Sequence, residues 1–338
     1  MLLTSSFNIR GGRVLSLLRP CVLLNLTKLI LLSFAATFLL FPSSSLAQST
    51  GVEVKSKNFV LTGDISVVEG KRLVKDLEIF RLSLFKLFKV ELEPEATPVK
   101  IYALKSTTQF QRLVKNKTVA GVYKKNIHGP IFVLDAKGGF KSGDAARRVA
   151  LHEYVHHVIA TYTNQKFPRW YNEGYANFLA NFEIKKGKFI IGAPDRNYGL
   201  YLKRASWMSM DTLIASVNQY PFQSGSLRGS QRDIQDAFYA QSWLAVTYLQ
   251  TNPNYARKSG EYLQRVHQGE DSIQAFTSTF EQSPEEFGRI LKSFLKQNKF
   301  LHYPFPLSKL EKKPEMTIRK LSPSEFQTAM IQANMQFN

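Results

Sequence analysis

The chain has 338 residues, of which 44% are hydrophobic, so it can bury the core of one large domain or of two modest ones. Lysine and arginine outnumber aspartate and glutamate by 45 to 26, which gives a formal net charge of +19. The basic residues are scattered and form no long basic block or aromatic-interleaved motif. The composition therefore argues against a nucleic-acid-binding protein and favours a generally basic surface, which could meet an anionic envelope surface.

The first 47 residues are typical of a secretory signal peptide. Basic residues precede the apolar run Leu29–Phe41, and the small-x-small sequence Ser45-Leu46-Ala47 follows it. We expect cleavage after Ala47 and a periplasmic or secreted mature protein, with an uncleaved signal anchor as the alternative. The single cysteine, Cys21, lies inside this leader. A secreted chain without a disulfide suits a bacterial periplasm.

The mature chain begins with alternating strands and amphipathic helices. We predict, in order, a strand over Val52–Leu61, a turn at Gly63 and Asp64, a long helix over Glu69–Val90, a strand over Val99–Leu104, a short helix over Thr107–Val114, and a hairpin of Val119–Tyr123 with Pro130–Leu134. A helix that starts at Asp144 follows, and Pro168 marks the start of the next helix.

Past Ala193 the chain is predicted to be mainly helical. The expected helices cover Asp211–Val217, Asp236–Gln250 with Asp236 as its cap, Tyr255–His267, and a segment to Gln297 opened by the capping box of Ser283 and Glu286. A polar loop, Ser224–Arg232, separates the first two. Beyond Tyr303 we expect a linker or wrapping tail with a short final helix near Pro323–Met335. The predicted parts are a signal peptide (1–47), an α/β subdomain (48–190), a helical subdomain (191–302) and a C-terminal tail (303–338).

The segment Arg147–Phe178 carries the residues with catalytic chemistry. His152 and His156 are four residues apart on the predicted helix, so their rings project from one face and can share a metal ion. Glu153 is rotated about 100° around the helix, beside such a metal, where it can take a proton from a metal-activated water. Glu173 on the next predicted helix is the best third ligand, because catalytic zinc takes three protein ligands and keeps one position open.

Two other interpretations of this segment remain: a zinc site without catalysis, and a solvated surface helix without metal. Flanking apolar residues argue against the second, because they would bury the helix, and buried histidines and a glutamate are costly without a partner. These flanking residues are Val149, Leu151, Val155, Val158 and Ile159. His157 points about 100° away from His156 and is expected to support or pack rather than bind metal. Gly174 would allow two helices to approach closely.

The sequence H-E-Y-V-H-H, followed by P-R-W-Y-N-E-G-Y-A, resembles the gluzincin zinc metallopeptidases of the thermolysin and alanyl-aminopeptidase lineage, and among them the small bacterial peptidase MA-like proteins. The likeness is sharp over residues 149–180 and loose over 52–300. It implies an α+β fold, in which two zinc-binding helices top a mixed sheet and a helical lobe closes the cleft. It also implies His152, His156 and Glu173 as ligands of one Zn²⁺, Glu153 as general base, and Ile131–Leu134 as the sheet edge where an extended peptide could pair.

In the aminopeptidase-like members, a tyrosine on a later helix donates to the oxyanion, and Tyr239 has a similar setting and distance after Glu173. Tyr239 could equally be a core residue beside Phe238 and Trp243. The glycine-rich strand motif of the exopeptidases is absent, which favours an endopeptidase. The resemblance thus predicts zinc-dependent hydrolysis of a peptide or protein substrate, with a non-catalytic zinc-binding envelope module as the alternative.

Overall fold

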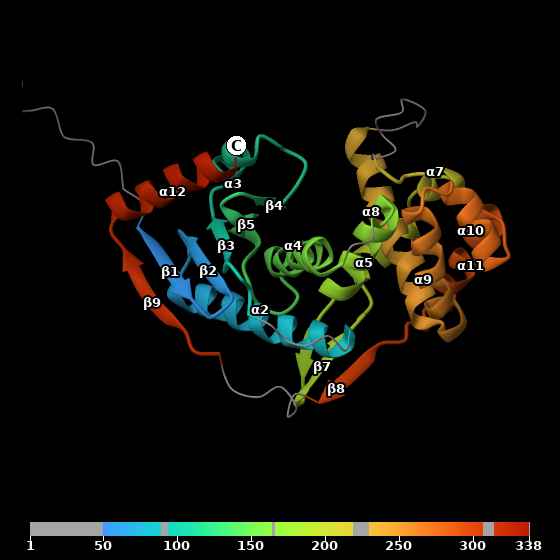
Figure 1. Ribbon diagram of the computed structural model, residues 1–338, viewed down its shortest axis with the longest axis horizontal. Coiled ribbons are helices and arrows are strands. Elements are labelled where there is room, and N and C mark those ends of the chain that lie inside the picture. Colours follow the sequence, from blue (N-terminus) through green and yellow to red (C-terminus); the bar gives the residue numbers. More distant parts are fainter. Residues whose placement is uncertain (1–49, 89–93, 164–165, 219–229, 307–313, 338) are drawn as a thin grey trace, which may run out of the picture. The chain divides into compact units, whose positions relative to one another are not determined.

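Figure 1 shows the computed structural model, which describes residues 50–88, 94–163, 166–218, 230–306 and 314–337. These residues belong to one compact unit, Ser49–Asn338. The predicted signal peptide lies outside the described residues, as does most of the predicted loop Ser224–Arg232. In the described ranges, no helix combines the length and the apolar character that crossing a membrane requires.

The main sheet has six strands in the order β4-β5-β3-β2-β1-β9. The central neighbours β2, β3 and β5 are parallel, whereas β1, β4 and β9 pair in antiparallel fashion. The strands are β1 Gly51–Lys55, β2 Phe59–Gly63, β3 Val99–Leu104, β4 Gly121–Asn126, β5 Gly129–Asp135 and β9 Thr317–Leu321. This mixed sheet and the many helices confirm the α+β class.

Two strand predictions were wrong. The strand expected over Val52–Leu61 is a hairpin of β1 and β2, because Ser56 turns the chain: its N–H donates to the Phe59 carbonyl, and the Phe59 N–H donates to its Oγ. The segment Ile131–Leu134 is not a sheet edge. It lies in β5, which pairs with β3 on one side and β4 on the other, so β4 is the edge strand.

Helices cover both faces of the main sheet (Figure 1). On one face, α2 (Val67–Phe88) and α4 (Ala145–Tyr162) contribute to the larger hydrophobic core. On the other face, α3 (Thr107–Val114) and α12 (Pro323–Phe337) pack around a smaller core. Because β4 contacts α4, the helix with the H-E-x-x-H sequence lies against the edge of the sheet.

Beyond α5 (Arg169–Ala180), the chain forms a small antiparallel sheet, of order β6-β7-β8, and a helical lobe. Their bounds are β6 Glu183–Lys185, β7 Lys188–Ile191, α6 Arg196–Leu202, α7 Met210–Ile214, α8 Gln231–Thr251, α9 Pro253–His267, α10 Ser272–Phe280, α11 Pro284–Gln297 and β8 Tyr303–Pro306. One hydrophobic core continues from the main sheet through α4 and α5 into this lobe.

The helices of the lobe confirm one predicted cap and correct another. The capping box of Ser283 and Glu286 opens α11 as expected. The cap of α8 is Ser230 rather than Asp236: the Ser230 side chain accepts from the Asp233 N–H, and the Asp233 carboxylate accepts from the Ser230 N–H. The elements α6, α10 and the hairpin β6–β7 were not predicted.

The chain after Tyr303 is more regular than the expected tail. β8 pairs with β7, β9 joins the main sheet beside β1, and α12 packs on the face of that sheet opposite α4. The predicted final helix near Pro323–Met335 is confirmed by α12. Segments from the two ends of the described chain therefore meet in one sheet.

Candidate metal centre

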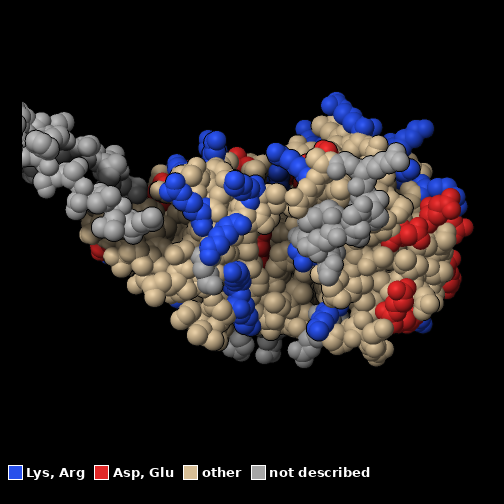
Figure 2. Space-filling view, turned by 90° about the horizontal axis from the view of Figure 1, so that it is seen from above, with Lys and Arg blue, Asp and Glu red and all other residues tan. Residues whose placement is uncertain are grey.

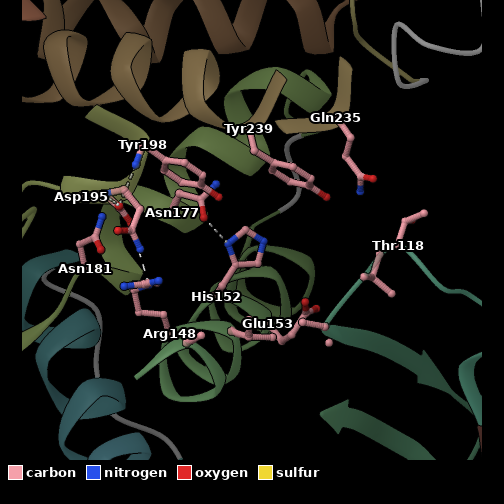
Figure 3. A pocket seen from close by; sticks show the side chains of 17 residues that line it. Thr118, Arg148, His152, Glu153, Asn177, Asn181, Asp195, Tyr198, Gln235 and Tyr239 are labelled. Atoms are coloured by element: carbon pink, nitrogen blue, oxygen red, sulfur yellow. Dashed lines mark hydrogen bonds and ion pairs between the residues drawn. The ribbon is translucent and has the colours of Figure 1, made fainter. Parts of the chain in front are cut away.

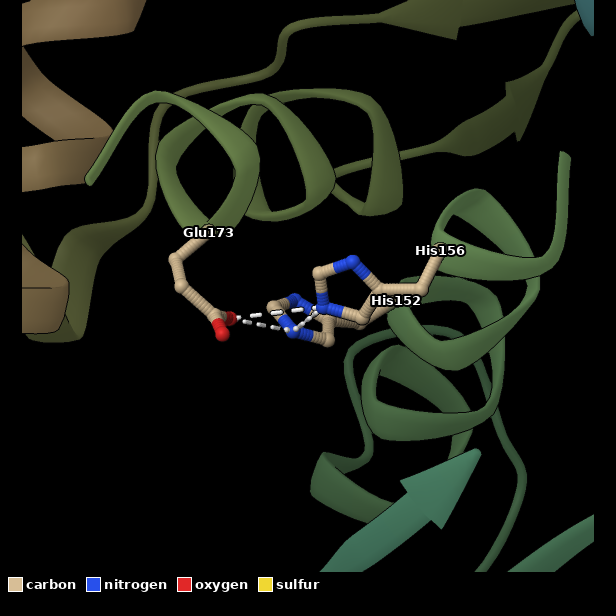
Figure 4. A group of neighbouring side chains, drawn as sticks. All are labelled: His152, His156 and Glu173. Atoms are coloured by element: carbon tan, nitrogen blue, oxygen red, sulfur yellow. Dashed lines mark hydrogen bonds and ion pairs between the residues drawn. The ribbon is translucent and has the colours of Figure 1, made fainter. Parts of the chain in front are cut away.

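Two helices bring the predicted metal ligands together (Figure 4). His152 and His156 are one turn apart on α4, and Glu173 projects from α5, which packs against α4. The His152 Nε2 lies 3.0 Å from the His156 Nε2 and 3.1 Å from the Glu173 Oε2. The His156 Nε2 lies 3.4 Å from that same oxygen. Three donor atoms thus surround one small space.

These distances fit a metal ion. Zinc bonds of about 2.0–2.2 Å at tetrahedral angles place ligand atoms roughly 3.3–3.6 Å apart, so the group, with separations of 3.0–3.4 Å, needs only a small expansion to hold the ion. The side chains of His152, His156 and Glu173 are only 14%, 16% and 7% exposed. Among the described residues, this is the one group of three or more His, Cys, Asp or Glu side chains close enough to hold a metal ion.

The charges in the group also favour a cation. Burial raises the pKa of Glu173, but the two histidines lower it more, to well below its ordinary value. Burial lowers the pKa of His156, but the Glu173 carboxylate raises it more. An ionised carboxylate beside two imidazole nitrogens stabilises positive charge between them, whether a proton or a metal ion carries it.

Asn177 orients His152. It lies one turn after Glu173 on α5, and its Oδ1 is 3.0 Å from the His152 Nδ1. Because the amide oxygen can only accept, it favours the tautomer of His152 with the proton on Nδ1, which leaves the Nε2 lone pair for a metal ion. Metal-binding histidines commonly have such a partner. Asn177 was not predicted from the sequence, although its spacing of four residues from Glu173 on a predicted helix was a usable signal.

Glu153 stands beside the donor group without joining it. Its side chain is buried and lines a cavity that His152 also lines (Figure 3). Burial raises the pKa of Glu153, an effect that the charges of His152 and His156 partly offset. A carboxyl group with a raised pKa is suited to exchange protons closer to neutral pH than an ordinary glutamate.

Gly121, the first residue of the edge strand β4, and residues 118–120 before it form one wall of this cavity. A Cβ at Gly121 would lie 2.3 Å from the Val149 Cγ1 and 3.4 Å from the Glu153 Cγ, so a glycine lets the strand come close to α4. The Ala120 carbonyl accepts from the Asp135 N–H. In an alternating antiparallel ladder, the backbone groups of residues 121, 123 and 125 therefore face the open edge of the sheet.

The cavity has a volume of about 320 Å³, and α4, α5, α6 and α8 supply most of its remaining walls. Tyr239 extends into it from α8 (Figure 3), while its ring packs edge-on against Phe238 with 5.8 Å between ring centroids. Tyr239 thus lines the cavity and also contacts Phe238, one of the residues beside which the sequence placed it as a core residue. Arg148, Tyr198 and Asn181 also line the cavity and were missed.

His157 belongs to a buried polar group on another side of α4. Its Nε2 lies 3.2 Å from the Glu95 Oε2, and its Nδ1 lies 3.2 Å from the Tyr123 hydroxyl. Glu95 also accepts from Arg81 and from the Tyr154 hydroxyl. This agrees with the expectation that His157 supports or packs rather than binds metal. Because Tyr123 belongs to β4, the group ties the edge strand to α4.

Comparison of the sequence with models of known protein families and with curated proteins finds no match. In the site itself, His152, His156 and Glu173 form a group that could hold a metal ion, and Glu153 and Tyr239 line the adjoining cavity.

Proposed function

We propose that this protein is a zinc-dependent peptide hydrolase of the gluzincin type, which acts in the bacterial envelope or outside the cell. The observation that carries the proposal is the convergence of His152, His156 and Glu173 beside a cavity that Glu153 lines. A structural metal site does not require a buried carboxylate that stands next to the ligands without joining them. The location rests on the N-terminal sequence, with cleavage expected after Ala47.

Zinc is the metal that this ligand set favours. Two imidazoles and one carboxylate form a known set for catalytic zinc, which keeps a fourth position for water or substrate. When bound, zinc would lower the pKa of a water in that position toward about 7 and polarise the substrate carbonyl. His152, His156 and Glu173 would hold the ion, and Asn177 would keep His152 in the tautomer that binds it.

We assign the proton transfers to Glu153. Its carboxylate would accept a proton from the attacking water and later deliver it to the leaving amine. Tyr239 is assigned the donation of a hydrogen bond to the oxyanion that develops on the substrate, because its side chain lines the same cavity as Glu153. Both assignments use side chains already directed at one cavity, so little reorganisation is needed during the reaction.

An extended peptide can bind along β4. The backbone groups of residues 121 and 125 face the open edge and can pair with a peptide as an added strand, whereas the Tyr123 N–H is directed at the Glu153 carboxyl group. Gly121 lies close to Glu153, so a peptide paired there would pass the general base. β4 thereby takes the role that the resemblance to gluzincins implied for Ile131–Leu134. Binding through the main chain of an extended segment suits an endopeptidase.

Replacing Glu153 by glutamine separates catalysis from metal binding. We expect Glu153→Gln to retain zinc while its kcat for peptide cleavage falls by about 10²- to 10⁴-fold, because an amide cannot accept the proton. Elemental analysis of the purified protein measures the zinc, and digestion of casein measures turnover. In the same assays, Glu173→Ala should lose most of its zinc, because it lacks one of the three donors.

Each variant has an outcome that contradicts its assignment. Retained cleavage by Glu153→Gln would remove Glu153 as the general base. A full complement of zinc in Glu173→Ala would remove Glu173 from the ligand set. Zinc binding by the unaltered protein without cleavage of any substrate would favour the alternative, a non-catalytic zinc-binding module of the envelope.

A further inference from the structure

Arg148 lies one turn before His152 on α4, so its side chain emerges on the same face of the helix as that ligand. It lines the cavity together with Glu153. Figure 3 shows it on one side of His152 with Asn181 and Asp195, whereas Thr118 and Gln235 lie on the opposite side. The cavity therefore contains a permanent cation close to the proposed catalytic centre.

The charge of Arg148 is only weakly neutralised. Its ion pair with Asp195 has 3.9 Å between Nε and Oδ2, which is too long for a hydrogen bond. The Asp195 Oδ1 instead accepts from the N–H groups of residues 197 and 198, at 2.9 and 3.1 Å, and so caps α6. A guanidinium has five N–H donors, and those of Arg148 make no hydrogen bond within the described part of the chain.

The neighbouring Arg147 shows how this fold satisfies a structural arginine. Arg147 is buried, its Nε donates to Asp76 at 2.6 Å, and its Nη1 donates to the Phe182 carbonyl at 2.9 Å. These bonds hold α4 to α2 and to the segment after α5. Arg148 makes no comparable links, although its side chain is only 31% exposed.

Two amides add donors on the same side of the cavity. Asn181 is 9% exposed, and its Nδ2 is buried without an acceptor among the described residues. The Nδ2 of Asn177 is likewise buried without an acceptor among the described residues, while the Oδ1 of the same amide contacts the His152 Nδ1. Buried donors without acceptors are costly. Both residues line the cavity, so a rotation of either side chain would bring its amide to an acceptor group that enters the cavity.

We propose that this end of the cavity is a subsite for a carboxylate of the substrate, bound by Arg148 with help from Asn181. A carboxylate is a planar acceptor that matches the paired donors of a guanidinium. The inference rests on the proposed peptidase function and deepens it by naming acidic peptides as the substrate class. Figure 2 agrees: Lys and Arg side chains stand on both sides of the hollow in this face, whereas most acidic side chains gather at the end of the helical lobe.

The carboxylate can come from an acidic side chain or from the free C-terminus of a peptide. Antiparallel strand pairs are the more common kind. A peptide antiparallel to β4 would run from Lys125 toward Gly121, so its carboxyl-terminal part would enter the cavity. Arg148 lines the wall of that cavity on the other side of His152 from Thr118, where a carboxylate on this part of the peptide can meet it. Both sources thus place the charge on the carboxyl-terminal side of the cleaved bond.

Pairs of quenched fluorescent peptides test the subsite. The peptides share one casein sequence and carry Glu or Gln at each position in turn, or a free or amidated C-terminus, and mass spectrometry maps the bond that is cleaved. For the unaltered protein we expect kcat/KM to be about 10- to 100-fold higher for the charged member of at least one pair. The pair that shows the preference identifies the source of the carboxylate.

Variants assign the preference to Arg148. In Arg148→Gln, the kcat/KM values of the two members of the pair should differ by no more than about threefold. Arg148→Lys keeps the positive charge but lacks the paired N–H donors of the guanidinium, so its ratio of the two kcat/KM values should be intermediate. Lys203→Gln removes one positive charge from an exposed position at the end of α6 and should keep the original ratio. A preference that survives Arg148→Gln would overturn the proposal.

A binding measurement separates this inference from the peptidase function. The Glu153→Gln variant, with and without Arg148→Gln, is titrated with the same peptides by fluorescence anisotropy. Equal binding and equal kcat/KM within every pair would overturn the subsite, even if all the peptides are cleaved. Failure to cleave any peptide would overturn the peptidase function, whereas tighter binding of the charged member that depends on Arg148 would still support the subsite.

Discussion

At the residue scale, the pKa values of the two buried glutamates of the site, Glu173 and Glu153, are shifted in opposite directions. Burial raises the pKa of both, but the histidines bring that of Glu173 well below its ordinary value, whereas burial prevails for Glu153. Geometry explains the difference, because the Glu173 Oε2 lies within 3.4 Å of both imidazole Nε2 atoms. A carboxylate with a lowered pKa, such as that of Glu173, is suited to hold a cation, and a carboxyl group with a raised pKa, such as that of Glu153, is suited to transfer protons.

Asn177→Ala should weaken zinc binding by about 10- to 100-fold, because His152 would lose the acceptor that fixes its tautomer. Competition with a chelating dye of known zinc affinity measures the change. Asn177→Asp keeps an acceptor and should retain the affinity. Asn197→Ala removes the same amide from an exposed position on the cavity wall and should have no effect on zinc. Equal affinities for Asn177→Ala and Asn197→Ala would show that Asn177 does not orient the ligand.

At the element scale, the position of Glu173 depends on how closely α5 packs on α8. A Cβ at Gly174 would lie 2.3 Å from the Ser242 carbonyl oxygen and 2.7 Å from the Val246 Cγ2. The prediction that Gly174 permits a close helix approach is therefore confirmed. Since Glu173 is the neighbouring residue, the distance between these helices helps to set where the carboxylate meets the two histidines.

Gly174→Ala should lower the free energy of unfolding by about 1–3 kcal/mol, because the backbone oxygen of Ser242 can yield only if α5 and α8 move apart. Urea denaturation measures this loss, and weaker zinc binding should accompany it. Gly260→Ala in α9 is the matched control: nothing lies near its added Cβ, so it should be neutral or stabilise by up to about 1 kcal/mol. A similar loss in both variants would contradict the close-packing explanation.

Elements with strong local signals were predicted closely. The strand β3 and the helix α3 have the predicted bounds, and Ser283 starts α11 as its capping box indicated. The elements that were missed are short and depend on distant partners. β7, for example, pairs with β8, which comes from beyond the last helix of the lobe. A strand of four residues carries too little periodicity to be recognised without that partner.

At the scale of the whole molecule, the C-terminal segment completes the sheet that supports the site. β9 pairs with β1 along its full length, so that side of β1 is covered and β4 remains the open edge beside α4. α12 covers the face of the sheet opposite α4, where Phe326 is buried against Gly51. The last elements of the chain thus pack on the first strands and leave β4 as the edge of this sheet next to the candidate metal group.

Phe326→Ala should lower the free energy of unfolding by about 3–5 kcal/mol, because it opens a cavity between α12 and the sheet. Ile331→Ala, on the same helix but 56% exposed, should change it by less than about 0.5 kcal/mol. Urea denaturation followed by tryptophan fluorescence compares the two. Equal midpoints would show that α12 does not contribute to the stability of the sheet.

By itself, the amino-acid sequence determined the composition of the candidate metal centre. Helical spacing puts His152 and His156 on one face, and the next helix carries Glu173, so short-range periodicity was enough to identify the group. Only the tertiary structure decided that β4 is the sheet edge and that Arg148 and Tyr239 line the cavity beside the group. The physical reason is the sequence separation of the interacting residues. Ligands on two adjacent helices follow from local periodicity, whereas a sheet edge and the walls of a cavity follow from pairing and packing between segments that are far apart in the sequence.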